Sequence, residues 1–205
     1  MIHYIKRDLL ESDCDYICHQ VNCKGKMNSG IAKAIREKWP VVYDKYRTKY
    51  ESMIMHPHPQ VRPEQMLGDI QTILVDTNQY VVNFFSQENY GYDGKRYTSY
   101  DAFWNCLNLL KEYAHPEATI AFPYKIGCVR GGANWRIIKL MIMEVFKDRE
   151  VFLYYLNNED LDTRDKEMVW LHDNIDKFIA CDWAFCCKNK TNHSLRSDKT
   201  RTSHF

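Results

Sequence analysis

Two glycine-containing stretches decide the fold of this chain: Ile17–Lys33, ICHQVNCKGKMNSGIAK, and Ile120–Trp135, IAFPYKIGCVRGGANW. Each begins with a short apolar run, which indicates a strand, and passes through glycines toward a segment whose apolar residues have helical spacing. A glycine loop that opens onto a helix presents backbone N–H groups at the positive end of the helix dipole. Two such loops predict a seat for a diphosphate, and two tight turns without a ligand are the alternative.

Glycine placement extends this pattern to a third loop. Seven of the eight glycines follow predicted strands, and only Gly68 stands apart. The seven are Gly25, Gly30, Gly91, Gly94, Gly127, Gly131 and Gly132. In open α/β sheets, ligands bind beyond the carboxyl ends of the strands, where glycine lets backbone amides approach a charged group. We therefore expect one binding edge of a sheet.

Apolar periodicity predicts strands and helices that alternate along the chain. The expected strands cover residues 2–6, 15–22, 68–75, 79–85, 118–123 and 151–156. Expected helices begin at Ile31 and Pro40, and two more cover about residues 100–114 and 134–146. A proline in the first turn of a helix loses no hydrogen bond, so Pro40 favours two abutting helices. The interleaving predicts an α/β fold with helices on both faces of a central sheet.

The composition changes beyond Leu156. An acidic segment leads to an expected amphipathic helix, with apolar positions at Met168, Leu171, Ile175, Phe178 and Ile179. Residues 184–205 carry five Lys or Arg residues and one Asp, which predicts a flexible basic tail. We expect one domain over residues 1–156, an appended segment over 157–183 and the tail over 184–205.

Composition and motifs exclude several classes of protein. The net charge of the 205 residues is +1, and the body is mildly acidic, which argues against a broad nucleic-acid-binding face. No apolar stretch is long enough to span a bilayer, and residues 1–6 lack an export signal, so we expect a cytoplasmic protein with reduced thiols. The P-loop, Rossmann, nucleophile-elbow and zinc-helix motifs are missing.

Two groups of potential metal ligands are better interpreted without a metal. His56 and His58 lie on a proline-rich segment and are expected to belong to an irregular connection. The spacing of Cys181, Cys186, Cys187 and His193 matches no usual zinc site. We expect no metal and no cofactor.

Five segments, in this order, resemble the macrodomain family, whose members bind ADP-ribose on a three-layer α/β/α fold with a central mixed sheet. The segments are Lys6–Leu10 (KRDLL), Ile17–Lys33, Leu67–Ile70 (LGDI), Asn83–Tyr97 (NFFSQENYGYDGKRY) and Ile120–Trp135. The sequence looks most like the bacterial and phage single-domain branch, which is related to ADP-ribose 1''-phosphate phosphatases and terminal ADP-ribose glycohydrolases. The resemblance implies a part in ADP-ribosylation and NAD metabolism.

The resemblance also implies roles for individual residues. Asp8 would accept a hydrogen bond from the adenine amino group, beside the Leu9 amide, and Asn22 would meet the distal ribose and hold a catalytic water. The implied ligand-binding set is Asp8, Leu9, Asn22, Met27, Asn28, Ser29, Gly30, Ile31, Ser86, Gln87, Tyr90, Gly127, Cys128, Val129, Arg130, Gly131, Gly132 and Leu156. For Asp8, a cap of a turn or helix is the alternative.

The chain departs from the family pattern at several positions. Arg7 and Asn28 replace glycines, and Val129-Arg130 replaces the usual Gly-Leu, so that Arg130 could clamp phosphate, fill the cleft or face solvent. The terminal ADP-ribose glycohydrolases, which remove ADP-ribose from glutamate, use a catalytic lysine and aspartate. Their positions would fall near Phe85 or Ser86 and at Gly131, so both residues are missing here and a lysine-adduct mechanism is not expected. His19 is open to two interpretations, a buried strand residue or a base. The charged residues Lys24, Lys26, Asp93 and Lys95 are candidates for electrostatic help.

Three hypotheses follow. The first is a hydrolase acting on an ADP-ribose derivative, either the 1''-phosphate or an ADP-ribosylated macromolecule. The second is a non-catalytic module that binds ADP-ribose or a related nucleotide. The third is a nucleic-acid-associated protein that acts through its tail, which the acidic body disfavours. A monomer is expected.

Overall fold

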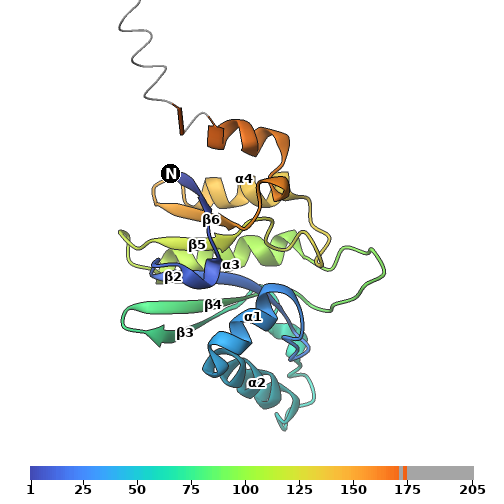
Figure 1. The fold of residues 1–205 in the computed structure, drawn as a ribbon. Coiled ribbons are helices and arrows are strands. Elements are labelled where there is room, and N and C mark those ends of the chain that lie inside the picture. Colours follow the sequence, from blue (N-terminus) through green and yellow to red (C-terminus); the bar gives the residue numbers. More distant parts are fainter. Residues whose placement is uncertain (171–172, 175–205) are drawn as a thin grey trace, which may run out of the picture. The chain divides into compact units, whose positions relative to one another are not determined.

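The computed structural model describes residues 1–170 and 173–174 and places a six-stranded mixed sheet at the centre of the first unit (Figure 1). Two compact units divide the chain, Met1–Asp160 and Leu161–Phe205. In the second unit, residues 163–170 and 173–174 are helical. The other predicted apolar positions of the appended helix, Leu171, Ile175, Phe178 and Ile179, lie outside the described residues, as does the predicted basic tail with its cysteines. The predicted boundaries at 156 and 183 stay predictions.

The sheet has the strand order β1-β6-β5-β2-β4-β3. Its strands are β1 (Ile2–Lys6), β2 (Tyr16–Asn22), β3 (Ile70–Asp76), β4 (Gln79–Gln87), β5 (Ile120–Pro123) and β6 (Val151–Tyr155). All neighbouring pairs are parallel except β3 and β4, which form an antiparallel hairpin. The predicted α/β class with a mixed sheet is therefore confirmed.

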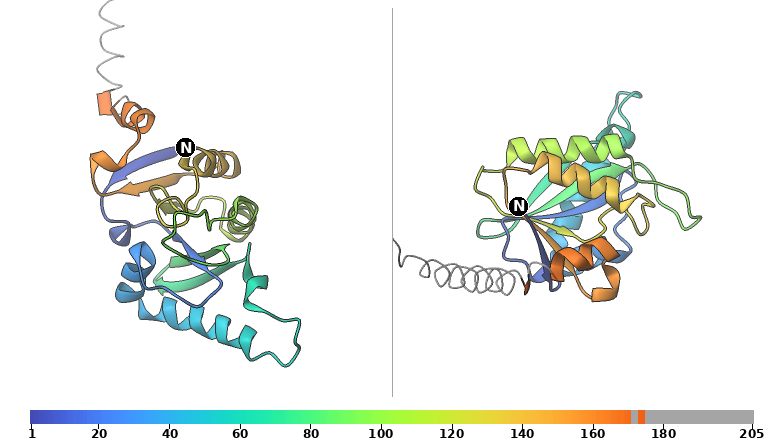
Figure 2. Two further views of the ribbon diagram at one scale, coloured as in Figure 1. Left: turned by 90° about the vertical axis from the view of Figure 1, so that its right-hand side faces the viewer. Right: turned by 90° about the horizontal axis from the view of Figure 1, so that it is seen from above.

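Helices cover both faces of the sheet (Figures 1 and 2). They are α1 (Gly30–Lys38), α2 (Pro40–Ile54), α3 (Tyr100–Tyr113) and α4 (Trp135–Val145), and Pro40 begins α2 as its position predicts. Alternate residues of a strand face opposite sides of a sheet. Accordingly Cys18 of β2 packs in the core under α3 and α4, whereas Ile17 and Val21 pack in the core under α1 and α2.

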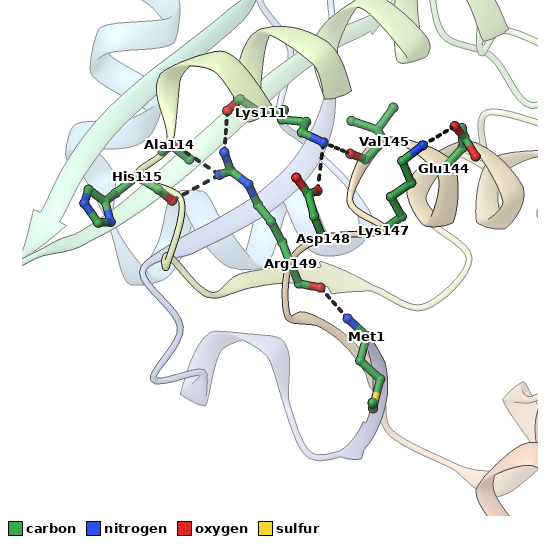
Figure 3. Close-up of polar contacts among 9 residues, drawn as sticks. All are labelled: Met1, Lys111, Ala114, His115, Glu144, Val145, Lys147, Asp148 and Arg149. Atoms are coloured by element: carbon green, nitrogen blue, oxygen red, sulfur yellow. Dashed lines mark hydrogen bonds and ion pairs between the residues drawn. The ribbon is translucent and has the colours of Figure 1, made fainter.

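The helices on the α3 and α4 face are tied together at their carboxyl ends (Figure 3). The Arg149 guanidinium donates to the carbonyl oxygens of Lys111 at 2.7 Å, Ala114 at 3.0 Å and His115 at 3.1 Å. The Lys111 ammonium in turn reaches the carbonyl oxygen of Val145 and a carboxylate oxygen of Asp148, both at 2.8 Å. Cations at helix carboxyl ends satisfy carbonyl groups that the helix leaves unpaired and interact favourably with its dipole.

His19 is a buried strand residue. Its side chain is completely buried, and Nε2 lies 2.5 Å from the Asn83 side-chain oxygen, which places the proton on Nε2. Its Nδ1 has no hydrogen-bond partner within the described part of the chain. Burial lowers the pKa of His19 from 6.5 to about 4, because the imidazolium would lose its hydration. The ring is therefore neutral at physiological pH, and its contacts lie in the core.

We expect this histidine to make the fold sensitive to mild acid. Between pH 6.5 and about 4 the unfolded chain binds a proton at this position that the folded chain does not, so the free energy of unfolding falls as the pH falls. The full loss in the free energy of unfolding from this group is about 3 kcal/mol. Urea denaturation from pH 7 to pH 4 measures it. His19→Gln should flatten the profile, and an unchanged profile in that variant would assign the acid sensitivity to other groups.

Candidate functional site

A cleft of about 350 Å³ lies at the carboxyl ends of the central strands and brings the predicted glycine loops together. Four segments line it: residues 20–22 at the end of β2, residues 26–32, Gln87 at the end of β4 with residues 90–92, and residues 123–131 from the end of β5 onward. The parallel arrangement of β2, β4 and β5 is the reason, because it places their carboxyl ends at one edge of the sheet.

The first loop presents backbone N–H groups to this cleft. Residues Met27, Asn28 and Ser29 line it, and their amide N–H groups have no acceptor among the described residues. Gly30 and Ile31 follow in the first turn of α1, where amides lack partners within the helix. Ser29 occupies the N-cap position, but its side chain makes no capping hydrogen bond. This end of α1 therefore offers several free donors together with the positive end of its dipole.

The second loop presents a similar set to the same cleft. Val129, Arg130 and Gly131 line the cleft, and within the part of the chain that the structure describes their amide N–H groups donate to no protein acceptor. The amides on either side are used inside the loop, since Cys128 donates to the Lys125 carbonyl oxygen and Gly132 to that of Cys128. Gly132 does not line the cleft.

Asn22 holds the turn that leads into the first loop. Its side-chain oxygen accepts from the Lys24 amide at 2.9 Å, the Lys26 amide at 3.3 Å and the Tyr46 hydroxyl at 2.9 Å, and its Nδ2 donates to the Lys26 carbonyl at 2.7 Å. With the oxygen fully used, Asn22 cannot act as a base. One hydrogen on Nδ2 is left for a ligand or a water, because a primary amide carries two.

Ser86 supports the site from behind. Its side chain is fully buried, and its hydroxyl lies 2.9 Å from the side-chain oxygen of Gln20, which itself lines the cleft. The resemblance places Ser86 against the ligand, whereas the geometry places it one layer deeper. The other two predicted residues of this wall, Gln87 and Tyr90, do line the cleft.

The residues predicted to meet adenine lie outside the residues that line the cleft. Asp8 is exposed, and its carboxylate accepts from the Leu10 amide at 2.9 Å, which caps the short 3₁₀ helix η1 (Leu9–Glu11). Leu9 is buried in the core, and Leu156 is 61% exposed. The capping alternative for Asp8 is thus realised, and the bond to one carboxylate oxygen leaves the other for a ligand.

Arg130 leaves the cleft open. Its guanidinium lies 4.7 Å from the ring centroid of Tyr92, and both residues line the cleft. A cation over an aromatic face is attracted to the π electrons of the ring. The contact joins the second loop to the segment after β4, so the bulk of Val129-Arg130 lies along the wall.

The charged candidates differ in how far they are neutralised. Lys24 pairs with Glu64 and lies 3.8 Å from Glu88, and Lys95 pairs with Asp93 at 2.9 Å. The hydrogen bond from Lys95 contributes most to lowering the pKa of Asp93 to about 2. Lys26 lines the cleft, is exposed, and has no side-chain partner among the described residues. It is the lysine of this group that is free to interact with an anion.

The positions of the lysine and aspartate pair hold no acid or base. Phe85 is fully buried, Ser86 is buried, and Gly131 has no side chain. No cluster of three or more potential metal ligands exists in residues 1–170 and 173–174, and the nitrogen atoms of His56 and His58 accept backbone hydrogen bonds from their own turn. No helix within the same residues is both long and apolar enough to cross a membrane.

Several lining residues are missing from the sequence-based set, among them Gln20, Tyr124, Lys125 and Ile126. Gln20 carries a usable signal, because it lies two residues before Asn22 and side chains two apart share a face of a strand. The others lie in loops, where no periodicity indicates direction.

Comparisons with known proteins were made by sequence and by structure. No family model matches the chain. It is 25% identical over 152 residues to the DNA ADP-ribosyl glycohydrolases of Mycobacterium tuberculosis and Mycobacterium bovis. The aligned part is 72% of this chain but only 39% of those proteins, so the likeness covers well under half of their length.

Solved structures match over most of the first unit's length. A Bacteroides thetaiotaomicron protein of unknown function has a TM-score of 0.63 and 29% identity, and covers 75% of this chain and 97% of its own. A macrodomain protein from Streptomyces coelicolor has a TM-score of 0.61 and 21% identity, with 76% and 99% covered. Thermosipho africanus DarTG in complex with ADP-ribose has a TM-score of 0.60 and 14% identity, with 80% and 44% covered.

Proposed function

We propose that this chain, whose macrodomain fold the structural comparisons confirm, binds ADP-ribose and hydrolyses an ADP-ribosyl derivative. One observation carries the proposal of binding. Two sets of unpaired backbone N–H groups, in residues 27–31 and 129–131, line one cleft. Charge-assisted hydrogen bonds from such donors suit the two phosphates of a nucleoside diphosphate sugar.

The comparisons support a hydrolase as the first candidate. The relatives at 25% identity are named DNA ADP-ribosyl glycohydrolases, so ADP-ribosylated DNA is a substrate to test beside the 1''-phosphate and protein-linked forms. Asn22 would hold a water through its remaining Nδ2 hydrogen, next to the phosphates of the ligand. Lys26 would add a positive charge to the same wall.

A non-catalytic module is the second candidate. It is favoured by the buried Phe85 and Ser86 and by Gly131, which stand where a related branch has its lysine and aspartate. A protein with this cleft would still bind ADP-ribose, since the donors are backbone amides.

The Asp8 carboxylate is expected to distinguish adenine from hypoxanthine. Asp8→Asn keeps an oxygen for the Leu10 amide but replaces the outer oxygen with an N–H₂ donor, which repels the adenine amino group. We expect about a tenfold loss of ADP-ribose affinity and a smaller loss, or a gain, for the hypoxanthine analogue. Calorimetry with both ligands checks this. Equal losses for the two ligands, or none, would remove Asp8 from the site.

Binding and turnover are tested separately. Calorimetry should show ADP-ribose binding at about micromolar strength, and the absence of heat would contradict the proposal. Product analysis follows with ADP-ribosylated DNA, ADP-ribosylated protein and ADP-ribose 1''-phosphate. Release of product from one of them supports the hydrolase, and binding without release from any supports the module. A monomeric state, a cytoplasmic location and a part in NAD metabolism stay predictions.

A further inference from the structure

A directed chain of hydrogen bonds lies behind the second phosphate loop. The Ser86 hydroxyl donates to the Gln20 side-chain oxygen at 2.9 Å, and Gln20 Nε2 donates to Thr98 Oγ1 at 2.9 Å. The Thr98 hydroxyl then donates to the Gly127 carbonyl oxygen at 2.8 Å. Each hydroxyl has one hydrogen to donate, so fixing its acceptor also fixes the orientation of the next group. We call Ser86, Gln20 and Thr98 the brace.

The backbone at Thr98 holds the other end of the same loop. The Gly131 carbonyl oxygen accepts from the Tyr97 amide at 2.8 Å and from the Thr98 amide at 2.9 Å. The carbonyl groups of residues 127 and 131 are therefore both fixed on one segment. Between them lie Val129 and Arg130, whose amides have no acceptor among the described residues.

The two glycines of the loop pack directly on the brace. A Cβ on Gly127 would lie 2.6 Å from the Gln20 side-chain oxygen, and one on Gly131 would lie 2.1 Å from Thr98 Oγ1. Thr98 is 2% exposed, so it cannot touch a ligand in the cleft itself. Its influence on a ligand has to pass through the loop.

We propose that Gln20 and Thr98 are positioning residues, which set the backbone of residues 127–131 so that its free amides can grip a phosphate. The inference rests on the proposed binding of ADP-ribose. The glycines only allow the backbone of the loop to adopt this conformation. Two side chains outside the glycine motif, those of Gln20 and Thr98, would hold the loop amides in place. Preorganised donors bind a ligand more tightly because less conformational freedom is lost on binding.

Thr98→Val tests the inference, because it keeps the shape of the side chain and removes the hydroxyl. We expect the Kd for ADP-ribose to rise about tenfold, while that for adenosine, which has no phosphate, stays within twofold. Thr98→Ser keeps the hydroxyl and should restore the affinity. The matched control is Thr119→Val, which loses a hydrogen bond to Asp15 at the start of β5. It should bind ADP-ribose as the unaltered protein does.

The outcomes separate this inference from the proposed function. ADP-ribose affinity within twofold of the unaltered protein in Thr98→Val, or an equal loss for adenosine, would overturn the role of the brace while binding itself stands. If the unaltered protein does not bind ADP-ribose, the proposed function fails. The brace is then decided by amide hydrogen exchange at Gly132 and Ala133, which donate within the loop to Cys128 and Gly127. Faster exchange in Thr98→Val than in Thr119→Val supports the brace, and equal exchange overturns it.

Discussion

Gly131→Ala is expected to weaken ADP-ribose binding at least 100-fold, which corresponds to about 2.7 kcal/mol. The added Cβ would lie 2.1 Å from Thr98 Oγ1, 2.4 Å from the Gly127 carbonyl oxygen and 2.8 Å from Gln20 Nε2. Two of these neighbours are buried or backbone atoms, so the loop itself has to move. Moving it displaces the amides of Val129 and Arg130 from the wall of the cleft, and calorimetry measures the loss.

The control for this variant is Gly94→Ala, in the segment after β4. A Cβ there meets no atom within 4 Å, although the positive φ of 74° adds about 1 kcal/mol of backbone strain. We expect its affinity for ADP-ribose to stay within about threefold. A Gly131→Ala variant that binds as tightly as this control would contradict the assignment of the second loop. The same crowding explains why this chain cannot carry an aspartate at position 131.

Asn22→Ala is expected to lower the free energy of unfolding by about 3 kcal/mol, because buried polar groups lose their partners. Asn22 is 6% exposed, and its removal leaves the Lys24 amide and the Lys26 carbonyl oxygen without their side-chain partner. The Lys26 amide keeps the Tyr46 hydroxyl as its acceptor at 3.0 Å, and that hydroxyl keeps the backbone carbonyl oxygen of residue 22 at 2.7 Å. Urea denaturation measures this loss. A stability within 1 kcal/mol of the unaltered protein would mean that these bonds contribute little.

Asn22→Asp tests the side-chain amide at the same position. A carboxylate keeps an acceptor for the Lys24 amide, but it loses the Nδ2 hydrogens, faces the Lys26 carbonyl oxygen that Nδ2 donates to, and places a negative charge beside the proposed diphosphate. We expect the urea midpoint to fall, because the buried carboxylate repels that carbonyl oxygen, and we expect ADP-ribose affinity to fall at least tenfold and any turnover to be lost. Turnover that survives in this variant would remove Asn22 from the catalytic step.

Local periodicity was sufficient to predict the elements of the sheet and its helices. The nearly continuous burial in 16–22 is typical of a central strand that is covered on both faces, and the helical spacing in 100–113 is typical of an amphipathic helix. The strand order depends on contacts between distant segments, which no local pattern encodes. The antiparallel pairing of β3 with β4 is local, because only Thr77 and Asn78 separate the two strands.

The part of the site that is made of backbone amides could be predicted from the sequence. Glycine loops after strands indicate the free amides of residues 27–31 and 129–131, because glycine placement reports on backbone geometry. Side-chain direction was less predictable. Ser86 turns into the core to meet Gln20, which lies 66 residues away in the sequence, so only the folded chain reveals this contact. The bond from the Leu10 amide to Asp8 is local, and the sequence left this cap open as the alternative to adenine binding.

The most direct test of the central claim is an NMR titration of the ¹⁵N-labelled protein with ADP-ribose. The account predicts that the backbone amides of both loops, residues 27–31 and 129–131, shift together and saturate with one Kd, while the amides of the β3–β4 turn at Thr77 and Asn78 stay unchanged. Saturable binding in which either loop's amides do not move would contradict the claim that the two loops grip one diphosphate.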